Sequence, residues 1–117
     1  MLRRKGEFPI TYEPHLKGGR DTVTIENFLL PEEMSGAGRL CGISVIPVGG
    51  SIGRHTHTGD FEIYYILEGK AHANDNGREV DLEPGDMLCC FEGDFHEIEN
   101  SGDIPLRYVA MILYTRK

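Results

Sequence analysis

Closely spaced turn signals are the feature of this sequence that most restricts its fold. Glycine and proline account for 15 and 6 of the 117 residues, which favours many short strands over long helices. The pair Asn76-Gly77 is a strong hairpin signal because both residues adopt positive φ readily. In Glu83–Asp86, proline and glycine occupy the second and third positions, as a type II turn requires. We therefore predict an all-β protein with mainly antiparallel strands, either a sandwich or a barrel.

The runs between these turns are short and apolar or alternating, and each is predicted to be a strand. They are Asp21–Leu30, Leu40–Val48, Ser51–Thr58, Phe61–Leu67, Lys70–Asn74, Arg78–Leu82, Met87–Phe91, Phe95–Glu99 and Leu106–Thr115. Pro31–Met34 is expected to form one helical turn. Residues 1–20 show little periodicity and predict an irregular N-terminal arm or an edge strand. No linker or internal repeat is visible, so residues 1–117 are expected to form a single domain.

Charge and composition exclude several kinds of partner. The net charge is −7, so the surface has little with which to neutralise the phosphates of nucleic acid or an anionic membrane. No apolar run approaches the ~20 residues of a membrane span, and the first residues lack the apolar segment of a secretory signal. The 3 cysteines have no CxxC spacing, which favours free thiols in a reducing compartment over a disulfide framework. We therefore predict a cytoplasmic protein with no nucleic-acid or membrane partner.

Two histidines and a glutamate lie close together near the middle of the chain. His55 and His57 are two residues apart, so in an extended strand both side chains lie on one face. A turn at Thr58–Asp60 separates them from the next strand, which could return Glu62 to the same place. Two imidazoles and a carboxylate that converge there would hold a divalent metal ion.

The spacing of these residues resembles the two sequence signatures of the cupin superfamily. The first matches Gly49, His55, His57, Glu62 and Gly69, and the second matches Gly85, Gly93, His96 and Asn100. The second signature departs from the cupin pattern at Phe91, where that pattern has a proline. The resemblance implies a small single-domain cupin, whose fold is a double-stranded β-helix, or jelly roll, with a metal ion inside its mouth.

The resemblance assigns four metal ligands to this chain: His55, His57, Glu62 and His96. His96 is also the only other histidine that lies between turn glycines and an extended apolar stretch. Three nitrogens and one oxygen suit Mn, Fe, Co, Ni, Cu or Zn better than Mg or Ca. The alternative is a polar, hydrogen-bonded core without metal, which would bury four titratable groups at considerable cost. We therefore expect one divalent transition metal ion as the cofactor.

The strand that carries Glu62 also indicates a pocket and a second subunit. Side chains two and four positions after Glu62 lie on the same face of the strand, so Tyr64 and Ile66 are expected to point toward the interior. Together with Phe91 they form the predicted substrate pocket. Tyr64 is expected either to donate a hydrogen bond in the pocket or to be a core tyrosine. The opposite face of Phe61–Leu67 is apolar as well. A second subunit is its simplest cover, so a homodimer is expected.

The resemblance also bears on function. Cupins with this ligand set include oxygenases, decarboxylases, isomerases and lyases, which implies a metal-dependent enzyme. Its expected substrate is a small polar molecule, carboxylate- or sugar-like, bound at the metal. A non-catalytic small-molecule binding or sensing module is the alternative, because fold alone does not decide activity. A structural role like that of seed-storage proteins is disfavoured, since such barrels usually lack the full ligand set. The sequence assigns no catalytic residue.

Overall fold

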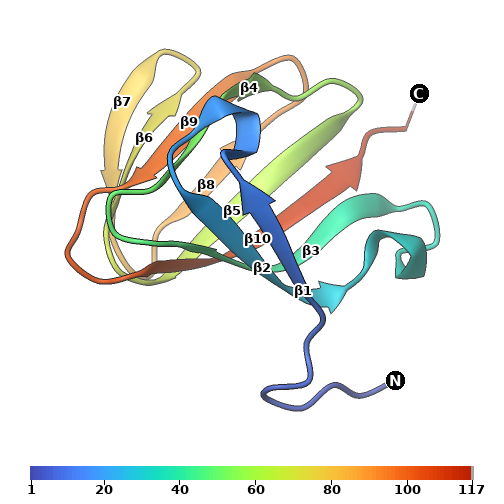
Figure 1. The fold of residues 1–117 in the computed structure, drawn as a ribbon. Helices are drawn as coiled ribbons and strands as arrows, with labels where there is room; N and C mark the ends of the chain where they lie inside the picture. The colour runs from blue at the N-terminus through green and yellow to red at the C-terminus, as the bar shows by residue number, and fades with distance from the viewer. Residues whose placement is uncertain (117) are drawn as a thin grey trace.

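The computed structural model describes residues 1–116, which form two facing antiparallel sheets (Figure 1). The six-stranded sheet contains, in spatial order, β1 (Ile10–Pro14), β2 (Thr22–Leu29), β3 (Gly38–Ile46), β10 (Leu106–Tyr114), β5 (Asp60–Glu68) and β8 (Met87–Cys90). The four-stranded sheet contains β4 (Ser51–Thr56), β9 (Phe95–Asn100), β6 (Ala71–Asp75) and β7 (Arg78–Leu82). Two short 3-10 turns, η1 (Leu16–Gly18) and η2 (Pro31–Glu33), connect strands of the larger sheet. This architecture confirms the predicted all-β jelly-roll fold.

The strands agree closely with those predicted from the turn signals. Each predicted strand is present, and its ends differ from the expected ones by at most two residues. The Asn76-Gly77 hairpin forms as expected, with φ of 51° and 96° at its two residues. Within residues 1–20, β1 is the edge strand of the six-stranded sheet, and η1 follows it. No helix among the described residues has the length and apolar character needed to cross a membrane.

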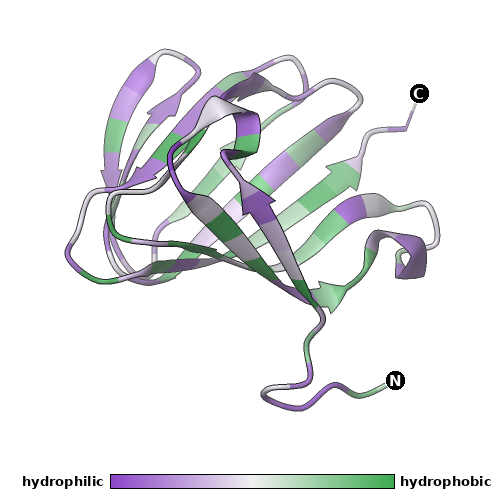
Figure 2. Cartoon of the chain, viewed as in Figure 1, coloured by the Kyte–Doolittle hydropathy of each residue, from purple (hydrophilic) through white to green (hydrophobic). Residues whose placement is uncertain are grey.

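The core lies between the two sheets and is built from alternate residues of each strand. Along β5, for example, buried and more exposed positions alternate from Asp60 to Ile66, as expected for a strand with one face toward the interior. Figure 2 shows the same alternation of hydrophobic and hydrophilic residues along several strands. The buried apolar cluster consists of Val23, Ile46, Ile52, Tyr64, Ile66, Ala71, Ala73, Leu82, Leu88, Ile98, Leu106, Tyr108 and Ala110.

The segment after β1 folds back across β4, which brings η1 against the start of the histidine strand. Two glycines allow this approach. A Cβ on Gly53 would lie 2.0 Å from the Lys17 carbonyl oxygen, and one on Gly19 would lie 2.1 Å from the Ser51 carbonyl oxygen. Because any side chain would clash with backbone there, both positions require glycine. As a result, η1 covers one side of the space between the sheets.

Candidate metal centre

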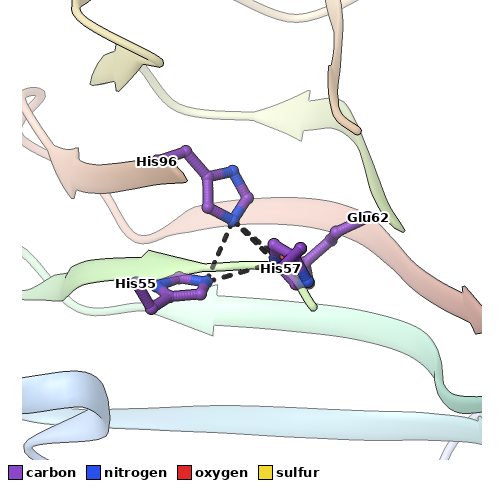
Figure 3. A group of neighbouring side chains, drawn as sticks. All are labelled: His55, His57, Glu62 and His96. Atoms are coloured by element: carbon purple, nitrogen blue, oxygen red, sulfur yellow. Dashed lines mark hydrogen bonds and ion pairs between the residues drawn. The ribbon is translucent and has the colours of Figure 1, made fainter. Parts of the chain in front are cut away.

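Four side chains from different parts of the chain meet between the sheets (Figure 3). His55 belongs to β4, His57 follows that strand, Glu62 belongs to β5 and His96 to β9. The His96 Nε2 atom lies 2.9 Å from His55 Nε2, 3.1 Å from His57 Nε2 and 3.1 Å from Glu62 Oε1. The four candidate ligand atoms all lie within 4.8 Å of one another. The structure thus brings together every residue assigned as a ligand from the sequence.

A β-bulge in β4 aims the histidines inward. Ile52 pairs with Ile98 and His55 pairs with His96, so β4 has one residue more than β9 between these two pairs. An extra residue in one strand shifts its side-chain alternation. Ile52 and His55 therefore both face the interior although they are three positions apart. Arg54, in the bulge, points outward and pairs with Glu97 at 3.2 Å.

Hydrogen bonds outside the cluster fix the orientation of two imidazoles. His55 Nδ1 lies 2.8 Å from the Gly53 carbonyl oxygen, and His57 Nδ1 lies 2.6 Å from Asp60 Oδ1. Both oxygens only accept hydrogen bonds, so in the neutral form of each imidazole Nδ1 carries the proton and Nε2 presents a lone pair. Asp60 was not singled out from the sequence, although it stands two residues before Glu62 and shares its inward parity.

Burial and mutual hydrogen bonding set the charges in the cluster. Burial opposes ionisation of Glu62, but hydrogen bonds with the three histidines outweigh it, so the pKa of Glu62 lies well below its usual range. Burial also disfavours the charged form of His57, yet hydrogen bonds with Glu62 and Asp60 raise its pKa. At His96 burial dominates and the pKa is lowered. Glu62 is therefore ionised and His96 neutral, which are the forms that bind metal ions, whereas His57 must release the proton that it shares with Glu62 when an ion binds.

The donor atoms fit a divalent cation. The Nε2 atoms of the three histidines and the Glu62 carboxylate converge on one point, where either shared protons or a bound cation must compensate their lone pairs. Ligand atoms at right angles around an ion with bonds of about 2.1 Å lie about 3.0 Å apart. The separations of 2.9 to 3.1 Å around His96 Nε2 match that spacing. The cluster could therefore hold a metal ion, and its donors do not fix which one.

A cavity of about 160 Å³ opens beside the cluster and contacts His55, His57 and Glu62. Part of its wall is aliphatic, formed by Leu16, Ile25, Leu40, Ile52 and Ile112. Polar groups also line it: Lys17 from η1 and Arg39 from β3 supply positive charge, Glu13 from β1 supplies negative charge, and Ser44 supplies a hydroxyl. The cavity thus combines a candidate metal centre, an aliphatic wall and charged side chains of both signs.

The three residues predicted to form the substrate pocket occupy different places. Tyr64 lines the cavity, stacks on His96 with ring centroids 5.0 Å apart and places its hydroxyl 3.5 Å from His96 Nε2. Burial raises the pKa of Tyr64, so this hydroxyl keeps its proton. Ile66 faces inward as expected but is part of the hydrophobic core, 1% exposed. Phe91 is 63% exposed and does not line the cavity.

Neither the hollow on the four-stranded sheet nor the cysteines offer comparable chemistry. This hollow, of about 520 Å³, lies on the outer face of that sheet. Four of its charged groups are already neutralised in the pairs Arg20–Glu99 and Arg54–Glu97. The three cysteines are unpaired, and burial raises the pKa of Cys90 to about 12, so it is not an activated thiolate. The metal-ligand cluster is therefore the candidate functional site.

The fold and the cluster are those of a cupin, and the chain belongs to that family. The family model described as "Cupin domain" matches residues 42–112, which include all four clustered residues. This confirms the resemblance inferred from the two sequence signatures.

The chain is also similar to individual proteins of known sequence or structure. The chain is 36% identical to the oxalate-binding protein of Thermotoga maritima, over 97% of this chain and 93% of that protein. A crystal structure of a predicted oxalate decarboxylase from Thermotoga maritima superposes with a TM-score of 0.91, at 36% identity over 98% of this chain and 100% of that one. The tetracenomycin polyketide synthase protein TcmJ of Streptomyces glaucescens is 31% identical over 84% of this chain and 63% of its own length.

Proposed function

We propose that this protein is a metal-dependent cupin that holds one divalent transition metal ion on His55, His57, Glu62 and His96. The observation that carries the proposal is the convergence of three imidazoles and one ionised carboxylate in a buried cluster. Asp60 and the Gly53 carbonyl support it by leaving the lone pairs of two imidazoles free for the ion. Mn, Fe, Co, Ni, Cu and Zn all accept this donor set.

The ligand is a small carboxylate-like molecule rather than a sugar. A cavity of about 150 Å³ in another protein is filled by a molecule as small as benzene, and the cavity here, at about 160 Å³, is of the same size. Together with a bound divalent ion, Lys17 and Arg39 outweigh the negative charges of Glu13 and Glu62 and favour an anion in it. The name of the relative from Thermotoga maritima, an oxalate-binding protein, supports the same class of ligand.

A bound metal ion and the side chains around it would contribute different parts of the chemistry. A metal ion bound there would supply Lewis acidity or, if it is redox-active, oxygen activation. The Tyr64 hydroxyl, which keeps its proton, is placed to donate a hydrogen bond beside His96. The aliphatic wall excludes water from one side of the ligand, which strengthens polar interactions at the other side. These features favour an enzyme of the oxygenase, decarboxylase or isomerase type.

The second candidate is a non-catalytic binding or sensing module. The name of the relative from Thermotoga maritima, which mentions binding alone, favours this candidate. The two candidates share the metal and the ligand and differ only in turnover.

Metal analysis of the purified protein tests the proposal. We expect about one equivalent of transition metal per chain and its loss in His96→Ala, because removing a ligand weakens the site. The matched control is His72→Ala, since His72 pairs with Asp81 and Glu79 away from the cluster. Unchanged metal content in His96→Ala would contradict the proposed site.

Ligand binding and turnover then separate the two candidates. We expect oxalate to raise the melting temperature of the metal-loaded protein but not of the His96→Ala variant. Release of carbon dioxide or formate, or uptake of oxygen, from oxalate or another small acid would identify an enzyme. Stabilisation by oxalate without any turnover in such a screen would favour the binding module.

We further propose that the protein is a cytoplasmic homodimer. The unpaired cysteines support a reducing compartment. The outer face of the six-stranded sheet supports a second copy, because apolar side chains with exposed fractions up to 60%, at Met87, lie side by side across it.

A further inference from the structure

Arg39 occupies an irregular position at the edge of the cavity. On β3, Leu40 pairs with Ile112 and Gly38 pairs with Leu113 of β10, so Arg39 between them is the extra residue of a β-bulge. A Cβ on Gly38 would lie 2.3 Å from the Ile112 carbonyl oxygen, which leaves only glycine at that position. Bulges redirect side chains near functional sites. Here the bulge turns Arg39 toward the start of β5.

One hydrogen bond fixes the guanidinium and connects it to the metal centre. Arg39 Nε donates to Asp60 Oδ2 at 3.0 Å, while Asp60 Oδ1 lies 2.6 Å from His57 Nδ1. Asp60 is buried, with its side chain 5% exposed, so it forms a rigid anchor, whereas the Arg39 side chain is 44% exposed. Within residues 1–116 the terminal Nη atoms of Arg39 form no hydrogen bond. Asp60 therefore holds the Arg39 guanidinium at Nε, and the two Nη groups remain free to bind a ligand.

These Nη groups belong to a residue that lines the same cavity as His55, His57 and Glu62. A planar guanidinium with two free N–H groups matches a carboxylate, which it binds through two parallel hydrogen bonds. Lys17 also lines the cavity, but an ammonium on a flexible stem selects charge rather than carboxylate shape.

We propose that Arg39 is a specificity-determining residue that binds one carboxylate of the ligand while another oxygen of the same molecule reaches the metal centre. The inference rests on the proposed function and deepens it. The proposed ligand is an anion with two oxygen-bearing groups, such as a dicarboxylate or a 2-oxo acid. A neutral sugar is excluded because it has no carboxylate for Arg39 to bind. Arg39 also contacts Asp60, so a purely supporting role for the metal ligand His57 must be distinguished from recognition of the ligand.

Binding measurements on cobalt-loaded protein make this distinction, with the metal content of every variant measured alongside. The probes are oxalate, which has two carboxylates, and imidazole, a neutral ligand of the metal that has none. We expect Arg39→Gln to weaken oxalate binding about 10- to 100-fold, the loss typical of a hydrogen bond to a charged group. Imidazole binding per bound cobalt should stay unchanged. Arg39→Lys should keep the pairing with Asp60 and still bind oxalate more weakly than the wild type.

The control is Arg54→Gln, which removes an arginine that is also ion-paired but faces the outside of β4. It should leave both affinities unchanged. Equal oxalate affinity in the wild type and both Arg39 variants at full metal content would overturn the inference. So would a parallel fall in oxalate and imidazole binding, which would assign Arg39 to the support of Asp60 alone. A wild-type protein that takes up no cobalt would instead refute the proposed function.

Discussion

At the scale of single residues, Asp60 determines which nitrogen of His57 faces the cluster. Its two carboxylate oxygens accept from His57 Nδ1 at 2.6 Å and from Arg39 Nε at 3.0 Å. An acceptor on Nδ1 leaves the Nε2 lone pair free for a metal ion and makes the imidazole more basic. An amide at this position could instead present its NH₂ group to Nδ1 and favour the opposite tautomer.

Asp60→Asn is therefore expected to lower metal affinity about 10- to 100-fold, the usual effect of losing a partner of a ligating histidine. Competition with a chromophoric chelator measures the affinity. Asp81→Asn is the matched control, because Asp81 also pairs with a histidine, His72, but is 89% exposed and far from the cluster in the sheet. An Asp60→Asn protein that binds metal like the wild type would show that the tautomer of His57 is fixed by other means.

How far the site could be predicted differs from residue to residue. His55, His57 and Glu62 follow from spacing and strand alternation, and His96 follows from the resemblance to the second cupin signature. Phe91 lies outside the predicted pocket because successive side chains of an extended strand point to opposite faces. Cys90, at the end of β8, is fully buried, so the side chain of Phe91 faces solvent. Arg39 could not be found by such parity, because its direction depends on a bulge that forms only when β3 pairs with β10.

At the scale of elements, turn chemistry predicts where strands begin and end but not where they bulge. The β4 strand illustrates this, since its bulge and its contact with η1 both occur at Gly53–Arg54. The sequence signals a flexible glycine there. It does not signal that the Lys17 carbonyl will lie against it, because that contact joins segments 36 residues apart in the chain.

Gly53→Ala should destabilise the protein by about 1–3 kcal/mol, the usual cost of overpacking a filled site. The new Cβ would lie 2.0 Å from the Lys17 carbonyl oxygen, so η1 or β4 must move. Urea denaturation measures the change. Gly102→Ala serves as the control, because its Cβ would meet nothing closer than 3.5 Å and its φ is not in the left-handed region. Equal unfolding midpoints for the two variants would mean that η1 does not press on β4 in solution.

At the scale of the whole molecule, the two sheets have outer faces of opposite character. The four-stranded sheet presents charged groups outward, including Arg54, Glu97 and Glu99. Many outward positions of the six-stranded sheet are apolar across four neighbouring strands: Cys41, Ile43, Ile63, Tyr65, Met87, Cys89, Val109 and Met111. Arg107, paired with Glu26 and Glu68, borders this apolar face. Strand parity predicted this apolar face on β5. It could not predict that β10 would lie between β3 and β5, since such pairing is not encoded locally.

The apolar face is large enough to form the centre of an interface between two chains. Four strands about 4.8 Å apart and up to about nine residues long at about 3.3 Å per residue cover about 430 Å², roughly half of the about 800 Å² that each partner buries in a typical stable interface. Met111 lies near its centre, with Ile63 and Cys41 as cross-strand neighbours.

Met111→Lys should therefore convert the homodimer into a monomer, because the interface would have to bury an unpaired charge. Light scattering after size-exclusion chromatography measures the mass in solution, and circular dichroism checks that the fold is kept. Ile104→Lys places the same charge on another apolar side chain, 49% exposed in the loop before β10, and should remain dimeric. A monomeric wild-type protein at high concentration would refute the homodimer, and a dimeric Met111→Lys variant would move the interface to a different face.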